Sequence, residues 1–211
     1  MIVEFSEAFA RGEQPPGYSL RGGSPSHVVS SLMSDEVIPD VKNWTWVLER
    51  ICDDCGFDSS KFDVLQTGHA IRDQAVRWAE VLESDDVAVR PKPGVWSPLE
   101  YGCHVRDVFR KFDERLELML THVDPQFENW DQDKTAIEDD YQSQVPIAAS
   151  AELSAAAVSL ATRFDSVASD QWTRRGFRSD GSVFTVETIA RYLMHDPVHH
   201  LFDVGAEVPQ Y

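Results

Sequence analysis

The sequence lacks long apolar runs and has few basic residues, and each absence excludes a class of function. No stretch approaches the roughly 18 apolar residues of a transmembrane helix, so we expect no membrane span. Lysine and arginine number 19 against 36 aspartates and glutamates, for a net charge of −17. A surface this acidic repels the phosphates of nucleic acids and the headgroups of anionic lipids. We therefore expect neither nucleic acid nor membrane as a partner.

Cysteine is also scarce, with three in 211 residues. Three thiols cannot all pair within one chain, and cytoplasmic thiols stay reduced. The opening residues Met-Ile-Val-Glu-Phe-Ser-Glu are acidic, whereas a signal peptide begins with basic residues. Together these features predict a cytoplasmic protein.

Three segments are predicted along the chain. Residues 1–32 hold four Gly, three Pro and six Ser without a sustained period, which is typical of a disordered extension. Because Met33 offers a second start, an error in the start site is the alternative. Residues 33–59 form a predicted N-terminal arm with aromatic side chains and a Cys-x-x-Cys motif, and residues 60–205 form the helical body.

Four amphipathic helices are predicted in the body, where apolar residues recur at helical spacing over about 60–83, 98–121, 151–165 and 185–204. The second has the clearest start, because Ser97-Pro98-Leu99-Glu100 is a capping box with proline at the first helical position. A small hairpin is expected around Ser179-Asp-Gly-Ser182, before the last helix. The fold class is therefore all-α, a four-helix bundle with minor strand content. The long acidic connection 123–149 is either functional or contains a short helix.

Two histidines of the last predicted helix have the spacing of metal ligands. His195 and His199 are four residues apart, so their rings project from one face and two nitrogens can reach one ion. His104 lies near the inward stripe of the second helix. The plainer alternative for each is a satisfied core histidine, since many pairs at this spacing are incidental. His200 is rotated about 100° from His199 and is expected at the rim.

Two segments resemble the signatures of a known family: Trp96-Ser-Pro-Leu-Glu-Tyr-Gly-Cys-His104-Val-Arg-Asp107 and Tyr192-Leu-Met-His195-Asp-Pro-Val-His199-His200-Leu-Phe-Asp203. The family is the DinB-like superfamily of metal-binding four-helix bundles, which includes bacillithiol transferases and mycothiol-dependent maleylpyruvate isomerase. The resemblance covers about residues 60–205. It implies one ion on His104, His195 and His199 with an open position. An all-histidine set is similar to that of the transferase branch, whereas the isomerase branch has a glutamate among its ligands.

The resemblance also implies a chemistry. The ion would be divalent, Zn²⁺ or Ni²⁺, and would bind a low-molecular-weight thiol as thiolate. The thiolate would attack an electrophile in an S-transfer or an isomerisation. Two alternatives stay open: activation of water for hydrolysis, and a non-catalytic metal-binding or stress-response module. A homodimer is a further open prediction.

Several polar and aromatic residues are candidates to support this site. Asp107 and Asp203 lie one turn from His104 and His199, so each carboxylate is a candidate acceptor for its neighbour's ring N–H, with a surface carboxylate as the alternative. Asp196 is expected to be exposed. Candidates for the pocket wall are Tyr101, Trp130, Asp131 and Tyr192, with a solvated acidic loop as the alternative for Trp130 and Asp131. Candidates to hold a carboxylate of an anionic thiol, or else to balance local acid, are Arg174, Arg175 and Arg178.

The motif Cys52-Asp-Asp-Cys55 is half of a zinc knuckle, and the sequence contains no second pair. We rank three interpretations: a reduced structural pair, a redox couple, and a zinc half-site that a histidine such as His69 completes. Cys103 is expected to point away from the face that carries His104.

Overall fold

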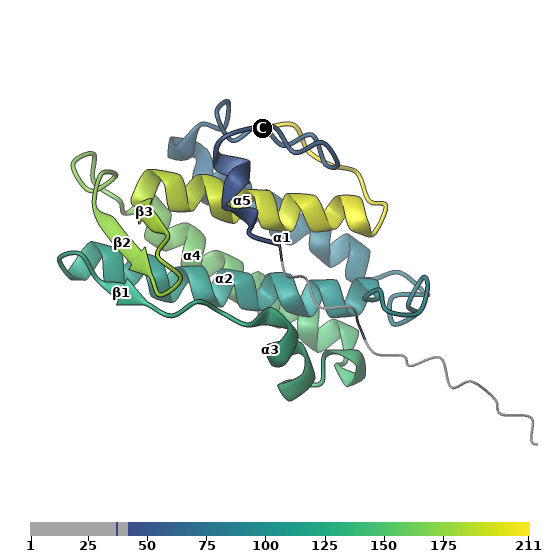
Figure 1. Ribbon diagram of the computed structural model, residues 1–211. Coiled ribbons are helices and arrows are strands. Elements are labelled where there is room, and N and C mark those ends of the chain that lie inside the picture. Colours follow the sequence, from purple (N-terminus) through teal and green to yellow (C-terminus); the bar gives the residue numbers. More distant parts are fainter. Residues whose placement is uncertain (1–36, 38–41) are drawn as a thin grey trace, which may run out of the picture. The chain divides into compact units, whose positions relative to one another are not determined.

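Four long helices form the body of the computed structural model, which describes residues 37 and 42–211 (Figure 1). They are α1 (Thr67–Leu82), α2 (Pro98–Thr121), α4 (Pro146–Asp165) and α5 (Val186–Asp203). Helix α4 packs along both α1 and α2, and α5 contacts the same two helices. The predicted all-α four-helix bundle is confirmed, whereas the predicted extension 1–32 lies outside the described residues. Within the described part of the chain, none of the helices has the length and apolarity that crossing a bilayer requires.

Local capping explains where α2 and α5 begin. The Ser97 hydroxyl accepts from the backbone N–H of Glu100 at 3.3 Å, and the Glu100 carboxylate accepts from the backbone N–H of Ser97 at 2.8 Å. Thr185 and Thr188 form the corresponding pair at the start of α5. Both starts agree with the sequence prediction, because a capping box satisfies backbone donors that the first turn leaves free.

Two other helix starts differ from the prediction. Helix α1 begins at Thr67 rather than near residue 60, because Asp63 first caps a 3₁₀ turn, η2 (Val64–Gln66). Helix α4 begins at Pro146, five residues earlier than predicted, because proline is favoured at the first helical position.

The connection before α4 contains strand β1 (Gln126–Phe127), helix α3 (Gln132–Glu138) and a 3₁₀ turn, η3 (Tyr141–Ser143). The short helix predicted as one alternative for this connection is therefore present. Strands β2 (Arg175–Arg178) and β3 (Val183–Thr185) form the predicted hairpin. Strand β1 adds to β2 in parallel, giving the order β1-β2-β3 (Figure 1).

The arm before α1 lies against the bundle. Its 3₁₀ helix η1 (Trp44–Leu48) contacts α5, and Val47 is fully buried (Figure 1). The following loop brings Cys52, Cys55 and Phe57 into the core. A segment distant in sequence from α5 therefore becomes its neighbour.

Candidate metal centre

Helix α5 carries four potential metal ligands on two adjacent faces. His195 and His199 form one pair four residues apart, and Asp196 and His200 form another. The pairs differ by one residue, which is a rotation of about 100° around the helix. They therefore face different neighbours.

The pair Asp196 and His200 faces α2 and meets His104. Potential ligand atoms of these three residues all lie within 4.8 Å of one another. His104 Nε2 is 3.4 Å from Asp196 Oδ1, and the ring centroids of His104 and His200 are 4.9 Å apart. We call this cluster the α2–α5 group.

Unsatisfied polar atoms show that the α2–α5 group fits a cation. His104 is fully buried, and neither of its ring nitrogens has a hydrogen-bond partner in the part of the chain that the structure describes. Asp196 Oδ1 is also buried and has no hydrogen-bond partner among the described residues. Buried polar atoms without partners are unfavourable by about 1–3 kcal/mol each. A divalent cation among two imidazoles and one carboxylate would satisfy them with donors that zinc and nickel accept.

Neighbouring histidines keep the carboxyl groups of Asp196 and Asp203 ionised. Burial would raise the pKa of Asp196, but His104 and His200 outweigh burial and lower this pKa to about 2. Asp203 accepts a hydrogen bond from His200 Nδ1 at 2.7 Å. Burial of Asp203 is outweighed in the same way by His200, so its pKa is also lowered. Asp203 thereby fixes the orientation of the His200 ring.

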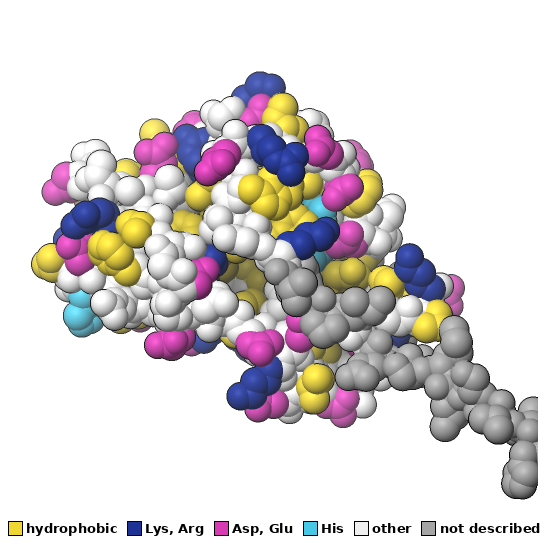
Figure 2. Space-filling model, in the orientation of Figure 1, with side chains coloured by type: hydrophobic (Ala, Val, Ile, Leu, Met, Phe, Trp, Pro, Cys, Tyr) yellow, Lys and Arg dark blue, Asp and Glu magenta, His cyan; other side chains and the backbone are white. Residues whose placement is uncertain are grey.

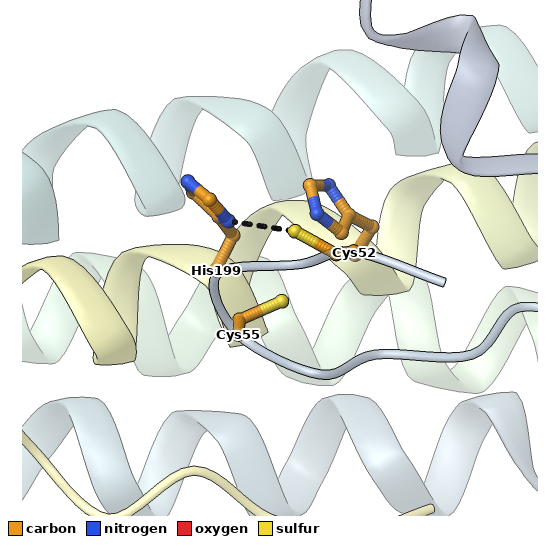
Figure 3. Close-up of side chains that lie close together, drawn as sticks. Cys52, Cys55 and His199 are labelled. Carbon is orange, nitrogen blue, oxygen red and sulfur yellow. Dashed lines mark hydrogen bonds between the residues drawn. The ribbon is translucent and has the colours of Figure 1, made fainter. Parts of the chain in front are cut away.

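The pair His195 and His199 faces the arm and meets Cys52 and Cys55. Potential ligand atoms of all four also lie within 4.8 Å of one another, and all four residues are buried. Cys52 Sγ is 3.5 Å from His199 Nδ1 (Figure 3). Burial lowers the pKa of His195 to about 4, so this ring is neutral at physiological pH. We call this cluster the arm–α5 group.

The ligands predicted as one set are thus divided between the two groups. His104 lies in the α2–α5 group, and His195 and His199 lie in the arm–α5 group. His200, expected at the rim, has only 16% of its side chain exposed, and half-buried Asp196 was expected to be exposed. The physical reason is the rotation of α5, which turns the second pair and not the first toward His104.

The predicted supporting carboxylates also differ from expectation. Asp203 binds His200 and is 3.9 Å from His199 Nε2. Asp107 does not reach His104, because its oxygens accept from Arg106 at 2.7 Å, Arg110 at 3.0 Å and the Tyr141 hydroxyl at 2.7 Å. Asp107 therefore joins α2 to η3 instead of orienting the His104 ring.

A cavity of about 90 Å³ opens beside both groups on α5. Of the predicted wall residues, Trp130 and Tyr192 line it. Trp130 also stacks on His104, with centroids 5.4 Å apart and planes inclined by 3°. On the face drawn in Figure 2, histidine atoms are visible beside a group of hydrophobic side chains.

The other two predicted wall residues lie outside this cavity. Asp131 accepts from the backbone N–H of Lys134 and so caps α3, and it lines a larger outer hollow of about 890 Å³. Tyr101 packs on His200 with ring centroids 4.9 Å apart and lines a separate hollow of about 300 Å³.

Arg115 is a cavity residue that the sequence prediction missed. It is 5% exposed, and its Nη2 donates to the carbonyl of Glu128 at 3.0 Å. Its Nε has no hydrogen-bond partner within residues 37 and 42–211, and no described carboxylate forms an ion pair with it. Burial, followed by the nearby charge of Arg178, lowers the pKa of Arg115 to about 10, so the cation persists at neutral pH. Its position in the sequence could have identified it. Arg115 follows His104 by 11 residues, which is about three turns of α2, so both side chains lie on the same face of the helix.

The three arginines in and beside the hairpin already have partners, which are either carboxylates or backbone carbonyls. Arg178 lines the cavity but binds Asp180 at 2.8 Å. Arg175 pairs with Asp124 at 2.7 Å, and Arg174 donates to the carbonyls of Met119 and His122. Arg115 is therefore the better candidate to hold an anion in the cavity.

Comparisons with known proteins identify relatives of this fold. Residues 68–202 match the family model of the DinB superfamily. The solved structure of YfiT from Bacillus subtilis is similar at 17% identity with a TM-score of 0.57, covering 82% of this chain and 95% of that chain. YfiT is described as a probable metal-dependent hydrolase with an unusual four-helix bundle topology. At 17% identity, the similarity to YfiT shows the fold alone. No curated protein sequence matches the chain.

Proposed function

Because the chain belongs to the DinB superfamily, we propose that it is a divalent-metal protein whose ion is held by His104, Asp196 and His200. The observation that carries this ligand set is the buried His104 ring, which lies beside Asp196 and His200 and whose two nitrogens have no hydrogen-bond partner among the described residues. Three ligands leave an open coordination position, as catalytic sites require. The set of His104, His195 and His199 predicted from sequence is the alternative that the experiment below tests.

We further propose that the reaction is a thiol S-transfer or an isomerisation of an anionic small molecule. Two imidazoles with one carboxylate are similar to the ligand type of the isomerase branch, which has a glutamate among its ligands. When bound, the ion supplies Lewis acidity and favours the deprotonated form of a thiol or of water. The ion would be Zn²⁺ or Ni²⁺, and the thiol a low-molecular-weight one such as mycothiol or bacillithiol, which fits a cytoplasmic location.

The chain's own residues have separate roles in this proposal. Arg115 holds a carboxylate of the substrate, because it is a buried cation on the cavity wall without a described carboxylate partner. Trp130 covers one face of His104 and excludes water from it. Asp203 keeps His200 in the orientation that places its Nε2 3.8 Å from Asp196 Oδ1.

A metal-dependent hydrolase is the second candidate function. The observation that favours it is the fold likeness to YfiT, itself described as a probable metal-dependent hydrolase. The cavity of about 90 Å³ has room for water in either reaction.

The ligand set is tested by metal titration of the full chain and of single variants. We expect His104→Ala, Asp196→Asn and His200→Ala each to weaken binding of one equivalent of Zn²⁺ or Ni²⁺ by more than about tenfold, because loss of an outer partner alone costs about 10–100-fold. The matched control is His122→Ala, which removes an exposed histidine after the last turn of α2. The proposal is wrong if Asp196→Asn and His200→Ala bind like the unchanged protein while His195→Ala loses the ion that His104→Ala loses.

The reaction is tested separately with the metal-loaded protein. Mycothiol, bacillithiol and glutathione are each offered with a generic electrophile, and ester and amide substrates are offered without thiol. Thiol-dependent turnover that His104→Ala abolishes supports transfer or isomerisation, and thiol-independent cleavage supports the hydrolase. Metal binding without turnover of any substrate would favour a non-catalytic module.

A further inference from the structure

The proposed catalytic ligand set leaves the arm–α5 group without a role. Cys52 and Cys55 are 1% and 6% exposed, and His195 and His199 are 4% and 7% exposed. Four metal-binding side chains are thus buried together where the arm meets α5. His69, considered from sequence as a partner of the cysteines, is not part of this group.

The spacing of these side chains matches a tetrahedral zinc site. Zinc binds sulfur at about 2.3 Å and imidazole nitrogen at about 2.0–2.1 Å, which places a sulfur and a nitrogen of one tetrahedron about 3.5 Å apart. Cys52 Sγ and His199 Nδ1 are 3.5 Å apart (Figure 3). His195 Nε2 is buried and has no hydrogen-bond partner among the described residues, so a bound cation would satisfy it.

We propose that Cys52, Cys55, His195 and His199 bind one Zn²⁺ in a closed structural site, distinct from the ion of the α2–α5 group. Two thiolates and two imidazoles are a donor set that structural zinc sites use, and four ligands fill the tetrahedron. On binding, each thiol loses its proton to solvent and forms one sulfur–zinc bond, so one Zn²⁺ displaces two protons and the centre is neutral. A neutral centre suits this buried position, because an uncompensated charge there would be strongly unfavourable.

The site would fasten the arm to α5 next to the cavity. The Trp44 ring lies 4.9 Å from the His199 ring and 5.4 Å from the His195 ring, and Trp44 also lines the cavity. Zinc on this group would therefore hold one wall of the catalytic cavity in place. One helix then carries two sites of different kinds, a closed one toward the arm and an open one toward α2.

The inference is tested with cobalt as a spectroscopic probe. The full chain is stripped of metal by a chelator under reducing conditions and then titrated with Co²⁺ or Zn²⁺. We expect two equivalents of metal per chain and an intense thiolate-to-cobalt charge-transfer absorption in the near ultraviolet. Cys52→Ser combined with Cys55→Ser should remove this absorption and one equivalent of metal. Cys103→Ala is the matched control and should retain both, because Cys103 lies outside the group.

The two proposed sites fail independently in this experiment. His104→Ala should lose one equivalent of metal and keep the thiolate absorption, so loss of the α2–α5 site leaves the present proposal intact. If the cysteine variants fail to fold, the absorption spectrum of the cobalt-loaded unchanged protein still tests the zinc site. Absence of thiolate absorption in the cobalt-loaded unchanged protein overturns the zinc site, as does a Cys52–Cys55 disulfide that persists under reducing conditions.

Discussion

Asp196 and His200 show how a shift of one residue along a helix decides which side chains lie beside His104. The sequence predicted that α5 faces inward and carries a ligand pair four residues apart, and it singled out His104 on α2. It chose the pair 195/199 and expected His200 at the rim and Asp196 to be exposed. Helix α5 is buried on most of its circumference, including residues 193–195 and 197–199, so hydrophobic periodicity does not fix its rotation.

The proposed role of Arg115, to hold an anion in the cavity, can be tested by a single substitution. We expect Arg115→Gln to keep its metal but to bind the dicarboxylate succinate about 10–100-fold more weakly, because a charge-assisted hydrogen bond contributes about 1.5–3 kcal/mol. The measurement is isothermal titration calorimetry on the metal-loaded protein. Arg110→Gln is the matched control, since Arg110 lies on the same helix but pairs with Asp107 and Glu152. Equal succinate affinity in Arg115→Gln and the unchanged protein would refute the anion-holding role.

At the scale of the element, helix boundaries were predictable where the signal is local. The start of α2 follows from Ser97, Pro98 and Glu100 alone. The start of α4 was missed, because Val145 offers no side-chain cap and Pro146 is the only local marker. Strand β1 could not be foreseen, because its parallel pairing with β2 joins residues about 50 positions apart in sequence.

The capping box at the start of α2 is expected to stabilise the fold through the Glu100 carboxylate. Glu100 is 2% exposed and binds Arg90 as well as Ser97. Burial would raise its pKa, but Arg90 and Ser97 outweigh burial and hold the pKa below its usual value of 4.5. The ionised form therefore stabilises the fold above that usual value, and this contribution is lost as the pH falls below it. We expect Glu100→Gln to lower the free energy of unfolding by about 1–3 kcal/mol at neutral pH.

Urea unfolding of Glu100→Gln at several pH values checks this expectation. The difference from the unchanged protein should shrink as the pH falls below 4.5, the usual value for this carboxyl. Glu114→Gln is the control, because Glu114 is exposed on the same helix and pairs only with Lys111 there. A difference that stays constant through the acidic range would contradict the assigned role of the Glu100 carboxylate.

At the scale of the whole molecule, the cavity is assembled from segments far apart in sequence. The arm contributes Trp44, the connection before α4 contributes Trp130, and the bundle contributes Arg115 and the histidines of α5. Sequence periodicity predicted the bundle itself, but it carries no information on how an arm and a long connection fold back over it. The cytoplasmic location and the homodimer stay predictions.

We propose that His104, Asp196 and His200 hold the metal ion of this DinB-superfamily protein, and anomalous X-ray diffraction would locate that ion. Crystals of the full chain loaded with Zn²⁺ or Ni²⁺ would be measured on both sides of the metal absorption edge. We expect an anomalous peak about 2.0–2.2 Å from a nitrogen of His104, a nitrogen of His200 and an oxygen of Asp196. An anomalous map with no peak among these three residues in metal-loaded crystals would contradict it.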